Sequence, residues 1–127
     1  MGQFDSTADT QFNLGFHYRL GLGVAKDEVE AVKWCRKAAE QDYAVAQFEL
    51  GVRYRMGLGV TKDEAEEVKW YRKAAEQDYA EAQFRLGLCY RFGNGVTKDE
   101  AEAFNWYRKA AGQGHQRAID MLKELGR

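Results

Sequence analysis

A glycine-rich stretch, "GLGVAKD" at residues 21–27, is the part of the sequence that most resembles a ligand-binding loop. Backbone amides of such a loop, together with Lys26, could hold a phosphate group. Nucleotide loops, however, follow a strand and carry a fuller fingerprint than this one. The stretch also recurs as "GLGVTKD" at 57–63 and "GNGVTKD" at 93–99. We therefore interpret it as a turn used three times, in which Gly21 ends one helix, Gly23 bends the chain and Asp27 begins the next helix.

Side chains able to act as nucleophiles or metal ligands are scarce. The chain has two histidines, His17 and His115, and two cysteines, Cys35 and Cys89. His17 and Cys89 fall two repeats apart, too far for one zinc ion, and the cysteines occupy non-equivalent positions, which argues against a disulfide. We predict no catalytic residues, no metal and no cofactor. A small-molecule-binding or hydrolytic enzyme is a remote alternative, since spatial neighbours are not visible in a sequence.

An internal repeat organises the chain. Residues 8–43, 44–79 and 80–115 align without a gap, with 26 of 36 positions identical between the first two copies and 24 of 36 between the last two. The three tryptophans, Trp34, Trp70 and Trp106, lie 36 residues apart. We expect residues 1–7 to be a short lead-in and residues 116–127 to form a C-terminal capping helix, all within one domain.

Each copy is expected to contain two helices joined by a tight turn. The first spans about Ala8 to Leu20 and ends at Gly21. The second starts with Asp27 as its N-cap and Glu30 three residues later, and runs to about residue 41. This capping role accounts for the carboxylate pair without acid–base chemistry. At the end of the chain, Ile119 and Leu122 are expected to cover the last repeat.

The repeated residues resemble the Sel-one-like repeat family, a relative of the tetratricopeptide repeat. The departures are Glu67, where the other copies have alanine, and Asp42 and Asp78, where glycine is usual; aspartate tolerates the left-handed backbone conformation better than most residues. The resemblance implies an all-α fold, a right-handed α-solenoid that recruits proteins and carries no chemistry of its own. In the second copy the matching positions are Ala44, Leu50, Gly51, Tyr54, Gly57, Gly59, Val60, Asp63, Trp70, Lys73, Ala74, Ala75 and Gln77.

Charge and hydropathy narrow the classes of partner. Of the 127 residues 31% are charged, with a net charge of -1, which disfavours a nucleic-acid partner. No apolar run approaches the roughly 20 residues of a membrane span. Without a secretory signal pattern and with two unpaired cysteines, we expect a cytoplasmic protein. We expect a monomer, with a dimer through the N-terminal end as the alternative.

The differences between copies suggest where a partner binds. On the first helices, unchanged positions fall on one face and changed positions on the opposite face. Polar residues at the changed positions would line a groove when the repeats stack, and the competing interpretation is a solvated face with no partner. The candidate protein-binding stripe comprises Asp9, Asn13, His17, Glu49, Arg53, Glu81, Arg85 and Cys89.

Apolar residues at changed positions are expected to form inter-repeat core instead. They are Phe16, Val52 and Leu88 in one row and Leu20, Met56 and Phe92 in another. Gly15 sits inside a helix, at a cost of roughly 1 kcal/mol, which close approach of the Ala38–Ala39 pair would explain.

The sequence therefore predicts a protein-interaction scaffold that binds a peptide or a partner helix in a concave groove. The near-identity of the copies leaves a second hypothesis open, an engineered or consensus-derived scaffold without a natural ligand.

Overall fold

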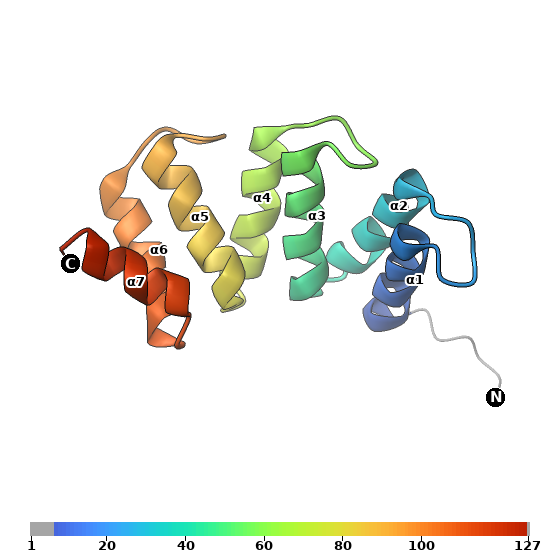
Figure 1. Ribbon diagram of the computed structural model, residues 1–127, viewed down its shortest axis with the longest axis horizontal. Helices are drawn as coiled ribbons and strands as arrows, with labels where there is room; N and C mark the ends of the chain where they lie inside the picture. Colours follow the sequence, from blue (N-terminus) through green and yellow to red (C-terminus); the bar gives the residue numbers. More distant parts are fainter. Residues whose placement is uncertain (1–6, 127) are drawn as a thin grey trace.

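The computed structural model describes residues 7–126, which form seven α-helices and no strand. The helices follow one another along the long axis of the molecule, from α1 at one end to α7 at the other (Figure 1). This confirms the all-α solenoid that the repeat predicts. The helices are α1 (Ala8–Leu20), α2 (Glu28–Ala39), α3 (Ala44–Met56), α4 (Glu64–Ala75), α5 (Ala80–Phe92), α6 (Glu100–Gly112) and α7 (Gln116–Glu124).

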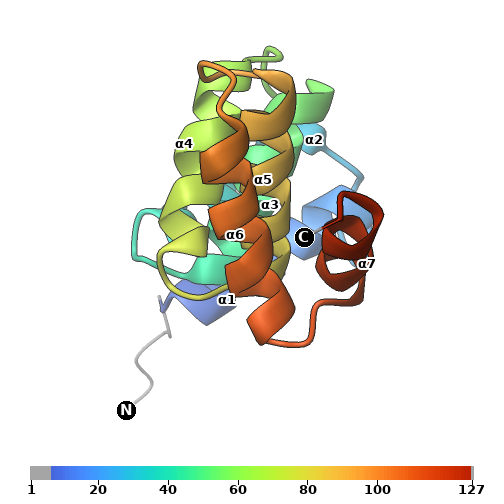
Figure 2. The ribbon, with the colours of Figure 1, turned by 90° about the vertical axis from the view of Figure 1, so that its left-hand side faces the viewer.

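Each helix packs against its neighbours in sequence, so each repeat is an antiparallel pair and successive pairs stack. The view along the solenoid shows α3 and α5 lying one behind the other, with α4 and α6 beside them (Figure 2). The first helices of the repeats thus form one layer, and side chains at equivalent positions of α1, α3 and α5 are brought into rows.

The predicted helix ends are present. Asp27 accepts a hydrogen bond from the Glu30 amide at 3.1 Å, and Gly21 adopts the left-handed conformation with φ 72°. The amide of Asp27 donates to the Tyr18 carbonyl at 2.9 Å, so the backbone of the glycine-rich turn is engaged within the repeat and not arranged around a ligand. Asp42 has a φ of 63°, as expected for a left-handed aspartate. The second helix is slightly shorter than predicted, ending at Ala39.

Close helix packing explains Gly15, although not through the predicted partner. A Cβ atom at Gly15 would lie 3.0 Å from the Ala31 carbonyl oxygen and 3.3 Å from the Cys35 nitrogen. The backbone of α2 therefore lies against Gly15 at Ala31 and Cys35 rather than at Ala38–Ala39, because the antiparallel pair brings the middle of α1 against the middle of α2.

A ladder of glutamine side chains joins successive repeats. Gln47 is 1% exposed, and its amide donates to the Ala39 carbonyl at 3.1 Å while its oxygen accepts from Gln77 at 2.9 Å. Gln83 and Gln113 repeat this arrangement one repeat later, with the same distances. These buried amides are satisfied on both sides, which makes them structural groups.

The capping helix α7 covers the third repeat as predicted. The buried cluster at this end includes Ala118, with Met121, Leu122 and Leu125 packed against it. Leu122 plays its predicted part. Ile119, which the sequence also assigned to this contact, is only half-buried and lies outside the cluster.

Candidate functional site

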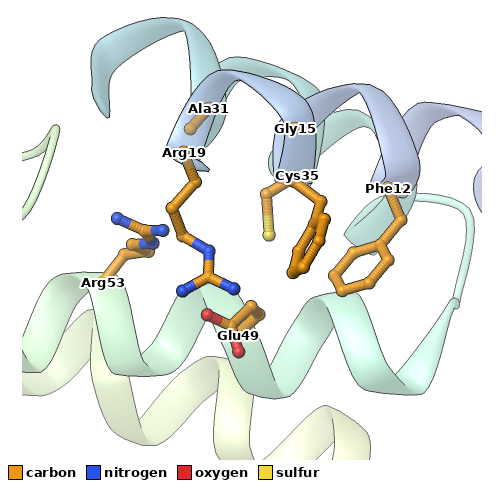
Figure 3. Close-up of a pocket in the computed structure, with 8 residues that line it drawn as sticks. Phe12, Gly15, Arg19, Ala31, Cys35, Glu49 and Arg53 are labelled. Atoms are coloured by element: carbon orange, nitrogen blue, oxygen red, sulfur yellow. The ribbon is translucent and has the colours of Figure 1, made fainter. Parts of the chain in front are cut away.

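A pocket of about 190 Å³ lies between the first and second repeats. Helix α1 contributes an aromatic wall, α2 the floor, and α3 two charged side chains (Figure 3). The helices that carry these residues are held by their caps and, between α2 and α3, by the hydrogen bond from Gln47 to the Ala39 carbonyl. The lining of the pocket is Phe12, Gly15, Phe16, Arg19, Ala31, Cys35, Glu49 and Arg53.

The thiol of Cys35 points into this pocket (Figure 3). It is 5% exposed and donates to the Ala46 carbonyl oxygen at 3.3 Å. Burial, aided by the nearby Glu49 carboxylate, raises the pKa of Cys35 to about 12. The thiol is therefore protonated near neutral pH, and since thiolates are the reactive form of cysteine, it is a packing group and a weak donor instead of a nucleophile.

Charged side chains surround the opening of the pocket. Arg53 is buried and its Nη1 lies 2.5 Å from Glu28 Oε1, so its charge is already paired. The Arg19 guanidinium stacks on the Phe16 ring at 4.9 Å and points toward Glu49 (Figure 3). The rim thus presents one cation and one anion facing each other, with no net charge excess.

A second depression, of about 260 Å³, adjoins the pocket and shares Arg19, Glu49 and Arg53 with it. Its walls include Leu20 from α1, and Val52 and Met56 from α3. Pocket and depression together form a continuous recess along the first-helix layer, which we call the first-helix groove.

The first-helix groove corrects one prediction from the sequence. Leu20, Met56 and Phe92 were expected in the inter-repeat core, but they are 48%, 54% and 60% exposed. They occupy equivalent positions of α1, α3 and α5 and form an exposed apolar row, of which Leu20 and Met56 line the first-helix groove and Phe92 extends the row onto α5. In the other row Phe16 is also exposed, whereas Val52 and Leu88 are half-buried and pack against the core as predicted.

The predicted polar stripe is divided by the structure into surface and packing positions. Asn13 and His17 are exposed, and Glu49 and Arg85 are half-buried. Arg53 and Cys89 are each only 4% exposed. These two side chains belong to the packing between repeats and do not offer a free surface, because position 53 of α3 and its equivalent on α5 point toward the preceding repeat.

Two further stripe residues contact the end of their own repeat or the capping helix. Asp9 accepts a hydrogen bond from the Tyr43 hydroxyl at 2.8 Å. At the equivalent position Glu81 lies 2.7 Å from His115 Nε2 and 3.5 Å from Arg117. Burial alone would raise the pKa of Glu81, but the hydrogen bond to His115 and the charge of Arg117 lower it below its ordinary value. Asp9 therefore links the two ends of the first repeat, and Glu81 links the third repeat to the start of α7.

The equivalent pocket between the second and third repeats is filled from within. Tyr71 takes the place of Cys35, is fully buried, and stacks on Phe48 with ring centroids 5.6 Å apart. Glu67, which replaces Ala31, is buried beside it. Sequence reasoning missed the open pocket, although a signal was present: "WCRKAA" in the first copy stands where the other two read "WYRKAA".

Metal and membrane features were also sought in residues 7–126. Within that range no three His, Cys, Asp or Glu side chains gather in a way that could hold a metal ion. None of the helices described there is long and apolar enough to cross a bilayer.

Three copies of the Sel1 repeat match the chain, at residues 8–43, 44–79 and 80–115. The chain belongs to the Sel1 repeat family. No curated protein matched it. A Sel1 repeat protein from Oxalobacter formigenes is a solved structure similar to it, with 47% identity and a TM-score of 0.85 over 87% of this chain and 46% of that one.

Two further solved structures are similar. The protective antigen c5321 of uropathogenic Escherichia coli, described as having an SLR fold, is 43% identical with a TM-score of 0.88, over 91% of this chain and 25% of that one. Helicobacter pylori cysteine rich protein B is 24% identical with a TM-score of 0.77, over 91% and 89%, a likeness of fold alone. This Sel1 repeat chain thus spans less than half the length of the first two proteins.

Proposed function

We propose that this Sel1 repeat chain is a protein-interaction module that binds a peptide or a helix of a partner in the first-helix groove. The observation that carries the proposal is the exposed apolar row of Leu20, Met56 and Phe92. Exposed apolar side chains grouped over a recess and rimmed by polar residues mark interaction sites more often than scattered ones do. Sel1 repeat proteins typically mediate protein–protein contacts, which agrees with this assignment.

The stripe residues that remain accessible would set specificity. Asn13, Glu49 and Arg85 occupy equivalent positions of α1, α3 and α5, and His17 is exposed one turn after Asn13. Their charges differ from copy to copy, so they would present a neutral, an acidic and a basic site in succession. A partner of complementary pattern would be held in one register along the first helices, with Glu49 at the groove itself.

The test is affinity capture with a disrupted groove. The triple variant Leu20→Asp, Met56→Asp, Phe92→Asp should lose the partners that the wild-type chain retains from a lysate of its own organism, as identified by mass spectrometry. A matched control, Val29→Asp, Ala65→Asp, Ala101→Asp, adds the same three charges at exposed, equivalent positions of the second helices. Loss with the first variant and retention with the second is expected; equal retention by both would contradict the proposal.

Location and oligomeric state follow as lesser proposals. The two cysteines are free and buried, which agrees with a reducing compartment such as the cytoplasm. We propose a monomer, which light scattering over a range of protein concentrations would test; a concentration-dependent rise to twice the 14.5 kDa mass would show a dimer instead.

A further inference from the structure

We propose that the pocket between α1, α2 and α3 binds the phenol ring of a tyrosine side chain presented by the partner protein. The inference rests on the proposed function and specifies what the partner must place in the groove. It comes from a comparison of the three equivalent positions within the molecule, two of which hold a tyrosine ring of the chain itself.

The aromatic surroundings of the missing ring are retained. Phe48 contacts two tyrosine rings, Tyr71 at 5.6 Å and Tyr79 at 5.5 Å between ring centroids. Its equivalent Phe12 keeps the second of these contacts, with Tyr43 at 5.6 Å. The first is missing, because Cys35 occupies the position of Tyr71. An open space therefore lies beside Phe12 where a ring packs in the next repeat.

The size of the space suits an aromatic ring. The cavity measures about 190 Å³. A cavity of about 150 Å³ lined by apolar side chains is known to hold benzene, so a phenol ring fits here. The helix backbone also leaves clearance: at Gly51 and Gly87 a Cβ atom would lie 2.6 Å and 2.5 Å from a tyrosine ring, and Gly15 keeps the same residue type beside the open pocket.

The charges at the rim favour a neutral occupant with a hydroxyl group. Arg19 faces Glu49 across the opening (Figure 3), and Arg53 is already paired with Glu28. A phenol hydroxyl can donate to the Glu49 carboxylate and accept from the Arg19 guanidinium. A carboxylate or an ammonium group would meet one like charge at close range. In the filled copy, burial raises the pKa of Tyr71 and the charge of Arg55, the equivalent of Arg19, partly counters that rise; among the described residues the Tyr71 hydroxyl itself has no hydrogen-bond partner.

The pocket also opens where a partner segment would lie. It shares Arg19, Glu49 and Arg53 with the depression that contains Leu20, Val52 and Met56. A peptide or helix resting on the apolar row can therefore direct one side chain into the pocket. That side chain would be fully desolvated, as the anchors of interfaces are, and tyrosine is enriched among such anchors.

The experiment titrates N-acetyl-L-tyrosinamide into the ¹⁵N-labelled chain and follows amide chemical shifts. We expect saturable shifts at Gly15, Ala31 and Cys35, with a dissociation constant on the order of 1 to 10 mM for a single side chain. N-acetyl-L-leucinamide is the control ligand and should bind at least several-fold more weakly.

The matched variant is Cys35→Tyr, which gives the first repeat the residue found in the other two. It should fill the pocket from within and weaken tyrosinamide binding at least tenfold. Cys35→Leu serves as a second variant that fills the volume by a different side chain, in case the tyrosine does not pack. The reciprocal pair, Glu67→Ala with Tyr71→Cys, should open the second pocket and produce new ligand-dependent shifts at Gly51.

Several results would overturn the proposal. One is the lack of saturable shifts at Gly15 and Cys35. Another is equal binding of leucinamide, which would make the occupant an aliphatic side chain. A third is undiminished binding of tyrosinamide by both filled variants. Shifts at the same amides that depend only on protein concentration would instead assign the pocket to a second copy of the chain. Each result leaves the capture experiment unaffected, because that experiment disrupts Leu20, Met56 and Phe92 and leaves the pocket lining intact.

Discussion

The interface between repeats one and two and the interface between repeats two and three are built from equivalent helices but differ in what occupies their centre. In the first, Ala31 and Cys35 leave an open pocket. In the second, Glu67 and Tyr71 fill the equivalent space and are 4% and 0% exposed. The open first interface and the filled second interface thus differ at these two positions of the second helix, while the order in which the helices pack is the same.

The exchanges are coupled by charge. A buried carboxylate at Glu67 requires nearby cations. Burial raises the pKa of Glu67 and that of its neighbour Tyr71, and Arg55 and Arg85 counter both rises. Where Ala31 removes the acid, position 49 carries Glu instead of the equivalent Arg85, so the first interface keeps a balanced set of charges. The comparison shows that the interface varies as a group of residues and not one position at a time.

The largest expected contrast is in stability. Tyr71→Ala should lower the free energy of unfolding by about 3–5 kcal/mol, because it removes a fully buried ring and leaves a cavity. Cys35→Ala should cost only about 1 kcal/mol, since little is lost beside a pocket that already exists. Urea unfolding of both variants measures the difference. Equal losses would mean that the two interfaces are packed to the same degree.

A smaller contrast is expected at the helix glycines. In Gly51→Ala the new methyl group would lie 2.6 Å from the Tyr71 ring, and such overpacking costs about 1–3 kcal/mol. In Gly15→Ala no ring stands in the way, and a gain in helix propensity of roughly 1 kcal/mol offsets the 3.0 Å contact with the Ala31 carbonyl oxygen. Thermal unfolding should rank Gly51→Ala below Gly15→Ala, and the reverse order would show that the Tyr71 ring moves aside freely.

The smallest contrast concerns pH. Burial raises the pKa of Glu67 above its ordinary value of 4.5, so the folded chain binds this proton more tightly than the unfolded chain. The contribution of Glu67 to the free energy of unfolding then falls as pH rises from about 4.5 through the raised pKa. Glu67→Gln should remove this dependence and be the more stable protein at pH 7.

Urea unfolding of the wild type and of Glu67→Gln over pH 4 to 8 measures that effect. Ala31→Gln is the matched control, since the first interface has no acid at this position and should show no such change in slope. Parallel pH profiles for the wild type and Glu67→Gln would contradict the assigned direction.

The sequence predicted much of the fold because the repeat supplies the same information three times. The cap at Asp27, the left-handed Gly21 and Asp42, and the bounds of α1 all follow from local rules that hold whatever the neighbouring helix does. The capping helix could likewise be inferred, although Ile119 was assigned a contact that Met121 makes.

The candidate site was less predictable because it depends on distances between helices. Differences between copies identify positions that are free to vary, but do not say whether such a position faces the next repeat or solvent. For this reason Leu20 was assigned to the core and is exposed, while Arg53 and Cys89 were assigned to a surface and are buried. The open pocket requires knowing that Cys35 stands opposite Phe12, which only the packed helices show.

The glutamine ladder has a mechanical consequence for binding. Gln47 on α3 and Gln83 on α5 each donate to a backbone carbonyl of the preceding repeat, so directional hydrogen bonds hold the junctions in addition to the buried apolar clusters that span them. Each junction should therefore resist bending, and the spacing between successive first helices should vary little. A partner that binds across both junctions, as proposed above, would need contact side chains at the spacing of the first helices.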